Sequence, residues 1–485
     1  MLIFMLACVG LVGGAAATPA ESEATARPNV LFFFADDQRA DTVGAWGNEH
    51  ISTPVIDSLV AKGTSFRQAY CMGSPHGAVC VPSRAMLHTG QPYFRVMQAD
   101  FAGRPTLGGL LGEAGYTTFG TGKWHNGQPS FLRSFQSGKA VFFGGMGNHH
   151  AMNLVDTEGE AVSNARLESR HSSELFADAA VGFLESYEDE APFFLYAAFT
   201  APHDPRDPPP AIRERDAERR PPLPANWKGQ HAFDNGFMTV RDEKLGPWPR
   251  TADLLHDQLA EYYGLIEHLD SQIGRVLDAL EKSGKAKNTL IVYAADHGLG
   301  MGSHGLLGKQ SLYEESTRAP VVIVGPGLPV GGETYASTYL FDLFPTLLVR
   351  CGVAPPADTF GHDLLPLLAG ETDANWPSVF TSMGKTQRAL RDGDWKLILY
   401  PKVGRTQLFN LASDPLELVN LAQQAEQLNR ITWMSLEIAN WQARVDDGQS
   451  IEMTTPAAPD VDLTGRERKP DRWQPEWIVE KYFGD

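Results

Sequence analysis

Four short runs of consecutive apolar residues are separated by segments in which apolar residues recur with helical spacing. The apolar runs occupy residues 29–34, 116–120, 192–199 and 289–294. Such runs are typical of strands that are buried on both faces of a sheet. The segments with helical spacing occupy residues 53–62, 107–114, 173–185 and 251–283. This alternation predicts an α/β fold with a large, mostly parallel sheet sandwiched by helices.

Each apolar run leads directly into polar residues that can carry chemistry. In chain order these are Asp36 with Asp37, Lys123 with His125, His203, and Asp296 with His297. In open parallel sheets, ligands bind beyond the carboxyl ends of the strands. We therefore expect these side chains to share one site at that edge of the sheet.

A different pattern follows a cluster of turn residues at positions 370–377. Short alternating runs occupy residues 378–382, 387–391, 395–400 and 406–410, and a helical pattern follows over 416–445. They predict a smaller C-terminal antiparallel sheet covered by a helix. We place a catalytic domain at residues 27–372, and a C-terminal α+β subdomain with an extended tail at 373–485.

Residues 204–250 interrupt the alternation of strands and helices. They contain the proline-rich stretches DPRDPPP, RRPPLP and GPWPR. Proline at this density is unfavourable inside helices and central strands, so we predict a long surface loop or lid. Together with the C-terminal region, this segment is expected to shape the substrate subsites.

Composition and charge exclude several classes of protein. The chain has 485 residues, of which 42% are hydrophobic and 21% charged, so disordered, collagen-like and coiled-coil classes are excluded. With 41 Lys and Arg against 59 Asp and Glu, the formal charge is −18. A net negative charge of this size does not favour binding to nucleic acid or to an anionic membrane. An anionic substrate would need a local cluster of cations and a metal.

The N-terminal residues predict export. Residues 1–17, MLIFMLACVGLVGGAAA, carry no charge and end in a small-residue cleavage pattern. We interpret them as a signal peptide, which places the mature protein in the periplasm or outside the cell, with no membrane attachment after cleavage. An uncleaved anchor is the alternative, although the run is short for a bilayer span. The four cysteines, Cys8, Cys71, Cys80 and Cys351, have no paired spacing that would indicate disulfides or a zinc site.

The densest motif is CVPSRAMLHTG, residues 80–90. Pro82 suits the first turn of a helix and Gly90 suits its end. Cys80 would then lie at a helix N-terminus, where free N–H groups favour negative charge, and Arg84 lies one turn further on. These residues predict a nucleophile that faces an anion, with a buried structural cysteine as the alternative.

The same stretch resembles the sulfatase signature C-x-P-S-R-x-x-x-L-T-G. Cys80, Pro82, Ser83, Arg84 and the closing Thr89-Gly90 match it, whereas His88 stands where the family has Leu. The resemblance to type I, formylglycine-dependent sulfatases of the alkaline phosphatase superfamily runs from about residue 28 to 422. It implies a sulfuric ester hydrolase acting on a sulfated small molecule or glycan.

The resemblance also implies a modified nucleophile. A maturation enzyme would oxidise Cys80 to formylglycine (3-oxoalanine). The hydrated aldehyde attacks sulfur with one hydroxyl and expels sulfate with the other, so the covalent intermediate can collapse without a second nucleophile.

Three carboxylates suggest a metal. Asp36, Asp37 and Asp296 follow two separate strands and would repel one another without a cation between them. By resemblance they are ligands of one Ca²⁺ per chain, with the modified Cys80 and His297. Whether His297 binds directly is left open, because calcium prefers oxygen donors. The metal would polarise a sulfate oxygen.

The remaining catalytic candidates are assigned by resemblance. Lys123 would stabilise negative charge, His125 would act as the base for sulfate elimination, and His203 as the acid for the leaving oxygen. Lys309, separated by ten residues from the Asp296-His297-Gly298 motif, would bind sulfate, and Arg84 would support the nucleophile. His304 is a candidate sugar contact, whereas His76 and Asn126 have no assigned role.

Two other functions fit these residues. Related enzymes use formylglycine on phosphorus, so a phosphonate or phosphodiester hydrolase is one alternative. The other is an inactive glycan-binding relative. Formylglycine at Cys80, with turnover of a sulfate ester and not of its phosphate counterpart, would separate the three.

Overall fold

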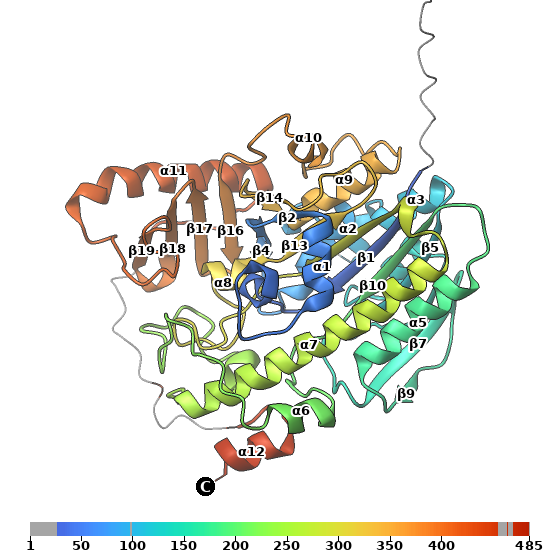
Figure 1. Ribbon diagram of the computed structural model, residues 1–485. Coiled ribbons are helices and arrows are strands. Elements are labelled where there is room, and N and C mark those ends of the chain that lie inside the picture. Colours follow the sequence, from blue (N-terminus) through green and yellow to red (C-terminus); the bar gives the residue numbers. More distant parts are fainter. Residues whose placement is uncertain (1–26, 98, 454–462, 464–468, 485) are drawn as a thin grey trace, which may run out of the picture.

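The computed structural model describes residues 27–97, 99–453, 463 and 469–484. Its centre is an 11-stranded sheet with helices on both sides (Figure 1). From edge to edge the path is β14 (Gly332–Thr334), β2 (Thr64–Phe66), β13 (Val321–Val324), β11 (Thr289–Ala295), β1 (Asn29–Ala35), β10 (Phe193–Ala198), β5 (Thr117–Lys123), β6 (Ser137–Phe142), β7 (Met152–Glu158) and β8 (Ala161–Val162), with β9 (Arg166–Glu168) paired to β7.

The four predicted strands form the middle of this sheet. β1 pairs in parallel with β10 on one side and β11 on the other, and β5 continues the parallel set beyond β10. All seven residues of β1 are buried, which explains why the run has no polar alternation. The predicted α/β fold is confirmed, and the carboxyl ends of four buried strands meet along one edge.

Helices cover the sheet on both faces. One group comprises α1 (Pro54–Lys62), α5 (Ser172–Ser186) and α7 (Ala252–Lys282). The other comprises α2 (Cys80–Thr89), α3 (Leu107–Glu113) and α9 (Leu343–Arg350). The helices predicted at 53–62, 107–114, 173–185 and 251–283 are therefore present with small shifts at their ends. Thr251 caps α7 by accepting a hydrogen bond from the backbone N–H of Leu254.

The C-terminal part forms the predicted smaller sheet. Its order is β19 (Arg405–Asn410), β18 (Trp395–Tyr400), β17 (Gln387–Asp392), β16 (Val379–Met383) and β4 (Gly73–Ser74). The helix α11 (Leu428–Val445) lies across it (Figure 1), with Ile438 and Trp441 buried. The strands β16 to β19 are antiparallel, whereas β4 comes from the N-terminal part and joins in parallel. The domain boundary at 372/373 stays a prediction.

The C-terminal helix begins later than the sequence pattern predicted. It starts at Leu428 and not near residue 416. The Asp414 carboxylate accepts hydrogen bonds from the N–H groups of Leu418 and Val419. These bonds give the backbone an alternative to helix at this point, which propensity and spacing do not reveal.

The proline-rich segment is not the simple surface loop that the sequence predicted. Residues 204–250 contain α6 (Pro210–Asp216) and the 3-10 helix η5 (Arg241–Leu245). Trp248 and Arg250 are buried, and Arg250 donates to the carbonyl and the carboxylate of Glu243. Glu243 in turn accepts from the backbone N–H of Leu307. Side chains thus satisfy a backbone that proline keeps out of regular structure.

The tail is also more ordered than predicted. Residues 476–482 form the helix α12 (Glu476–Tyr482), not an extended chain. Ile478 is buried, and Lys481 Nζ is 2.6 Å from a carboxylate oxygen of Asp257 in α7. The tail therefore gains its helix by packing on the catalytic part.

Within the ranges that the structure describes, none of the helices is both long enough and apolar enough to span a bilayer. The predicted signal peptide at 1–17 lies outside the described residues. Cys71, Cys80 and Cys351 are buried free thiols, as the cysteine spacing predicted.

Candidate active site

The predicted site residues converge at the carboxyl edge of the central sheet. Asp36 and Asp37 follow β1, Lys123 ends β5 and His125 comes just after it, and His203 lies beyond β10. Asp296 and His297 follow β11, while Cys80 and Arg84 lie in the first half of α2. Lys309 comes from the loop after β11. The structure thus brings together distant side chains, such as those of Asp37 and Lys309, which are 272 positions apart.

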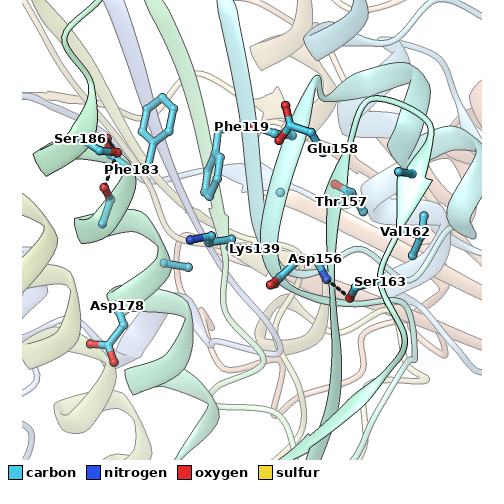
Figure 2. A pocket seen from close by; sticks show the side chains of 15 residues that line it. Phe119, Lys139, Asp156, Thr157, Glu158, Val162, Ser163, Asp178, Phe183 and Ser186 are labelled. Carbon is cyan, nitrogen blue, oxygen red and sulfur yellow. Dashed lines mark hydrogen bonds between the residues drawn. The ribbon is translucent and has the colours of Figure 1, made fainter.

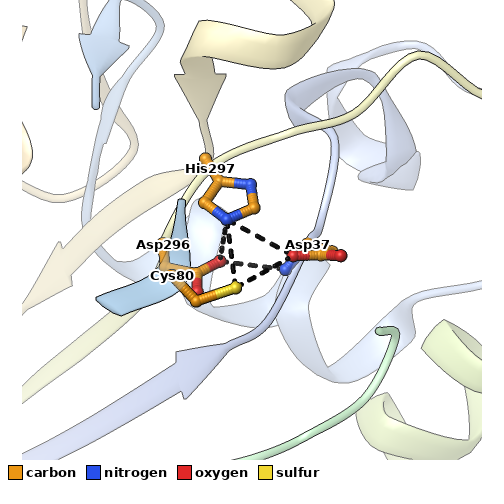
Figure 3. A group of neighbouring side chains, drawn as sticks. All are labelled: Asp37, Cys80, Asp296 and His297. Atoms are coloured by element: carbon orange, nitrogen blue, oxygen red, sulfur yellow. Dashed lines mark hydrogen bonds and ion pairs between the residues drawn. The ribbon is translucent and has the colours of Figure 1, made fainter. Parts of the chain in front are cut away.

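Four of these residues form a compact group around the Cys80 thiol (Figure 3). Potential ligand atoms of Asp37, Cys80, Asp296 and His297 all lie within 4.8 Å of one another. Cys80 Sγ is 3.3 Å from His297 Nε2 and 3.5 Å from Asp37 Oδ1. The backbone N–H of Asp37 donates to Asp296 Oδ1 at 2.9 Å. His297 Nδ1 faces the carbonyl oxygen of Gly298 at 2.9 Å, which leaves Nε2 directed at the group.

Asp36 lies between the side chains of Lys123 and Arg84. Its carboxylate bonds to Lys123 Nζ and lies 3.4 Å from Arg84 Nη2. Arg84 also lies 3.5 Å from Asp296 Oδ2 and donates to the carbonyl of Lys123 at 2.8 Å. Arg84 therefore holds the carboxylates and the end of β5, and does not contact the thiol directly.

The three carboxylates have different proton affinities although all are buried. Burial would raise the pKa of Asp36, but Lys123, His203 and Arg84 outweigh it and hold that pKa well below its ordinary value. For Asp37, the effect of burial is overcome by His203 and Lys309, which lower the pKa to about 2. Burial raises the pKa of Asp296 to about 6. Asp36 Oδ1 is buried and accepts no hydrogen bond. Clustered carboxylates with an unbonded oxygen fit a divalent cation.

The Cys80 thiol is not set up as a thiolate. Burial raises its pKa well above the ordinary value, and the charges of Asp296 and Asp36 add to the effect. The charges of Lys123 and Lys309 lower the pKa of the thiol but do not offset burial. A protonated thiol is a poor nucleophile.

His125 is held in an unusual backbone conformation. Its φ is +65°, and that of Asp37 is +66°, a region that non-glycine residues rarely adopt. Burial, aided by Lys123, lowers the pKa of His125 to about 2, so the ring is uncharged at neutral pH. Its Nδ1 has no hydrogen-bond partner. The ring packs on Gly145, where an added Cβ would lie 2.1 Å from His125 Nε2.

Lys309 and His203 complete the centre. Lys309 Nζ is 2.8 Å from both carboxylate oxygens of Asp37, 3.3 Å from Cys80 Sγ and 3.1 Å from His203 Nε2. His203 Nδ1 lies 2.7 Å from the carbonyl oxygen of Asp204, so Nδ1 carries the proton and Nε2 faces the centre. Burial lowers the pKa of His203.

A cavity of about 450 Å³ opens over Cys80. It is lined by Gly77, Ala78, Cys80, His125, Gly145, Met146, His203, Val240, Arg241, Asp242, Lys309 and Gln310. Sequence patterns missed Arg241, Asp242 and Gln310. Gln310 adjoins Lys309 and could have been suspected, but nothing in the proline-rich segment marks Arg241 or Asp242. As expected, that segment shapes the cavity.

The three residues are tied to one another. Arg241 Nη2 is 2.9 Å from Asp242 Oδ1, and Arg241 Nη1 donates to Asp204 Oδ2 at 2.5 Å. Gln310 Nε2 donates to Asp242 Oδ2 at 2.5 Å and to the carbonyl of Gly77 at 2.8 Å. The cavity wall is therefore polar and held in place on this side.

The cavity over Cys80 is smaller than a second cavity of the protein. A larger cavity of about 780 Å³ lies between α5 and the strands β5 to β8 (Figure 2). It contains Phe119, Phe183, Lys139 and Asp156, but none of the predicted site residues. We assign the site by chemistry rather than by volume.

Several residues near the motifs lie outside the site. His88 is buried against Trp124 and Tyr196, and burial lowers its pKa to about 3, so it packs as a neutral ring. His304 stacks on Tyr313 and does not line the cavity over Cys80, and its role as a sugar contact stays a prediction. Asn126 donates to the carbonyl of Val81, and His76 Nδ1 accepts from the N–H of Ala78. Neither side chain lines the cavity over Cys80.

Comparison with known proteins agrees with this chemistry. Residues 28–353 match the model of the sulfatase family, and residues 302–444 match a model described as N-sulphoglucosamine sulphohydrolase, C-terminal. An arylsulfatase of Clostridium perfringens is 29% identical over 456 residues, covering 84% of this chain and 93% of that protein. An N-acetylglucosamine-6-O-sulfatase of Bacteroides thetaiotaomicron is 26% identical over 481 residues, covering 84% of each. A structure solved with its substrate D-glucosamine-2-N,6-O-disulfate has a TM-score of 0.73 at 24% identity, covering 87% of this chain and 99% of that one.

Proposed function

The chain belongs to the sulfatase family and is a sulfuric ester hydrolase, and we propose that it is an exported enzyme that removes sulfate from a carbohydrate through a formylglycine at Cys80. The observation that carries the proposal is the state of Cys80. Its thiol is buried among carboxylates with a raised pKa, yet it lies 3.3 Å from Lys309 Nζ in the floor of the cavity. A nucleophile is expected there, and an unmodified thiol is a poor one.

Formylglycine resolves this difficulty. Its hydrated aldehyde supplies two hydroxyls, of which one attacks sulfur and the other expels sulfate by re-forming the aldehyde. Lys309 and Lys123 lie where they would offset the negative charge of the sulfate group. A separate maturation enzyme would have to oxidise Cys80, and this is a second part of the proposal.

Two histidines would move the protons. The negative charge of a bound sulfate raises the proton affinity of both rings. His203 keeps its Nδ1 proton on the Asp204 carbonyl, so a second proton on Nε2 faces the centre and can pass to the leaving oxygen. His125, which has an unpartnered Nδ1 and lines the same cavity, would take the proton of the second hydroxyl when sulfate leaves.

Asp36, Asp37, Asp296 and His297 would hold the divalent cation. The abundance of carboxylate oxygens favours Ca²⁺, and the ion would polarise a sulfate oxygen. His297 Nε2 is aimed at the same point, which supports it as a ligand.

Export and a carbohydrate substrate are supported by other observations. Residues 1–17 have the pattern of a signal peptide, which favours the periplasm or the extracellular space. One relative is an N-acetylglucosamine-6-O-sulfatase. The polar wall formed by Arg241, Asp242 and Gln310 suits the hydroxyl groups of a sugar.

The test combines mass spectrometry with a substrate panel. The protein would be co-expressed with a formylglycine-generating enzyme, and the peptide that contains Cys80 analysed for loss of sulfur. Activity on sulfated mono- and oligosaccharides should follow the formylglycine fraction, and matched phosphate and phosphonate esters should be poor substrates. Full activity with unmodified Cys80 would contradict the mechanism. A preference for phosphonates would indicate a phosphonate or phosphodiester hydrolase. Binding of glycans without turnover would indicate an inactive glycan-binding relative.

A further inference from the structure

A second group of metal-binding side chains lies outside the active site. His304, Glu315 and Glu417 each place a potential ligand atom within 4.8 Å of the others. Glu315 lies in α8 (Glu314–Thr317), beside the C-terminal sheet (Figure 1), and Glu417 lies in the turn after β19. His304 comes from the loop that leads to Lys309. The three residues thus join the catalytic part to the C-terminal part.

One buried carboxylate oxygen of this group lacks a partner. Glu315 Oε1 has no hydrogen-bond donor, and the nearby Asn226 Oδ1 has none either, whereas Glu417 Oε1 lies 3.0 Å from Lys396 Nζ. The side chains of His304, Glu315 and Glu417 are 5%, 8% and 0% exposed. Leaving a buried carboxylate oxygen unsatisfied is costly, so such atoms indicate an ion or water that completes the site.

The neighbouring cations are directed mainly at another carboxylate. Lys396 Nζ is 2.9 Å from Glu314 Oε1 and 3.0 Å from Glu417 Oε1. Arg391 and Arg318 also pair with Glu314, at 2.9 and 3.9 Å. Among the ion pairs of the described residues, Glu315 has only His304, whose Nε2 is 3.7 Å from Glu315 Oε1. The group therefore has room for more positive charge.

We propose that His304, Glu315 and Glu417 bind a divalent transition metal ion such as Zn²⁺. One imidazole nitrogen and two carboxylate oxygens are a ligand set that zinc accepts, with the fourth position open to water. His304 is oriented for this role by stacking on Tyr313 at 3.8 Å. Its Nε2 has only a 3.2 Å contact with the Asn226 amide, which the metal would displace. A cavity of about 220 Å³, lined by His304 and Glu417 among others, gives access.

The consequence is a structural link that goes beyond the proposed reaction. The ion would fasten the loop that carries Lys309 to the turn that follows β19. It would be separate from the active-site cation, because none of its three ligands lines the cavity over Cys80. Its loss should therefore be seen first in stability.

The first test counts bound metal. Because the active site could itself take zinc, Asp296→Asn would serve as the background, in buffer that contains excess Ca²⁺. After treatment with EDTA and addition of Zn²⁺, we expect elemental mass spectrometry to detect one zinc ion per chain. Adding Glu417→Gln or Glu315→Gln should lower Zn²⁺ affinity at least about tenfold. Unchanged zinc binding in both double variants, or no zinc in the background, would overturn the proposal.

The second test uses thermal unfolding and guards against misfolded variants. In the Asp296→Asn background with excess Ca²⁺, Zn²⁺ should raise the Tm, and the additional Glu417→Gln substitution should remove this rise. In EDTA, Glu315→Gln should be at least as stable as the wild type, because it removes a buried carboxylate that lacks a cation. If Zn²⁺ changes the Tm of neither protein, water satisfies the oxygens and the metal site does not exist. If Glu315→Gln is already destabilised in EDTA, the group is an ordinary structural contact.

Discussion

At the scale of single residues, the active site depends on side chains that are held in place by their neighbours' shape as much as by charge. His125 is the clearest case, since its ring rests against a glycine. Its φ of +65° and its unpartnered Nδ1 show that local preference does not place it there. Strained positions of this kind are found at functional sites.

Gly145→Ala tests this arrangement. The new methyl group would lie 2.1 Å from His125 Nε2, so the ring must swing away. We expect kcat to fall by roughly 10²-fold or more if His125 is the base, with little change in Tm. Gly147→Ala is the matched control, because its Cβ would meet only ordinary contacts at 3.6 and 3.8 Å. Equal activity of the two variants would argue against His125.

His203→Ala tests the acid. Its Nε2 is 3.1 Å from Lys309 Nζ and faces the cavity. Alkyl sulfates need a proton on the leaving oxygen, whereas activated aryl sulfates barely do. The kcat of the variant should therefore fall by about 10²–10⁴-fold on a sugar sulfate and by much less on nitrophenyl sulfate. Equal losses on both substrates would make His203 a binding residue instead.

At the scale of elements, the short strand β4 comes from the N-terminal part and forms one edge of the C-terminal sheet. Gly73 in β4 has a φ of +110°, and it lies so close to β16 that an added Cβ would be 1.9 Å from the Ser382 carbonyl oxygen. The strand precedes the loop that leads to Cys80. Its pairing therefore helps to fix the C-terminal sheet against the start of α2.

Gly73→Ala should break this pairing. The cost combines a left-handed backbone, about 1–2 kcal/mol, with a collision against rigid backbone, about 1–3 kcal/mol. Gly47→Ala is the control, because Gly47 has a similar φ of +103° but nothing within 4 Å of its Cβ position. Denaturant unfolding would measure both. If the two variants lose equal stability, the close approach of β4 and β16 contributes nothing.

At the scale of the whole molecule, the C-terminal tail packs on the part of the chain that forms the cavity wall. Asp471 lies 3.6 Å from Arg241, which lines the cavity, and Gln474 donates to the carbonyl of Leu245 at 2.6 Å. Further along, α12 is attached to α7 through Asp257. The tail thus supports the proline-rich segment from outside.

Ending the chain at residue 453 should therefore lower Tm and raise KM for sugar sulfates more than it lowers kcat. The reacting groups keep their contacts, whereas Arg241 and the backbone near Leu245 lose support. Asp471→Asn isolates the effect on the cavity, and Tyr482→Phe isolates the attachment of α12 to Asp257. Unaltered KM in the truncated enzyme would show that the tail is irrelevant to substrate binding.

The sequence by itself determined the central sheet and the family chemistry. The apolar runs of β1, β5, β10 and β11 identify strands because burial on both faces leaves no polar alternation. The polar residues that follow them had to meet, since parallel strands end at one edge. The CVPSR motif indicated Cys80 as the candidate nucleophile. The hydrophobic pattern and the motif were enough for these predictions, because each consists of residues that are close together in the sequence.

Only the tertiary structure decided the rest. The order of the proline-rich segment, the helix α12, and the contributions of Arg241 and Asp242 depend on contacts between distant parts of the chain. The high pKa of Cys80 depends on burial, which no motif records. The group formed by His304, Glu315 and Glu417 likewise joins residues as far as 113 positions apart, His304 to Glu417. Such features arise from packing between distant segments, and spacing along one sequence carries no information about that packing.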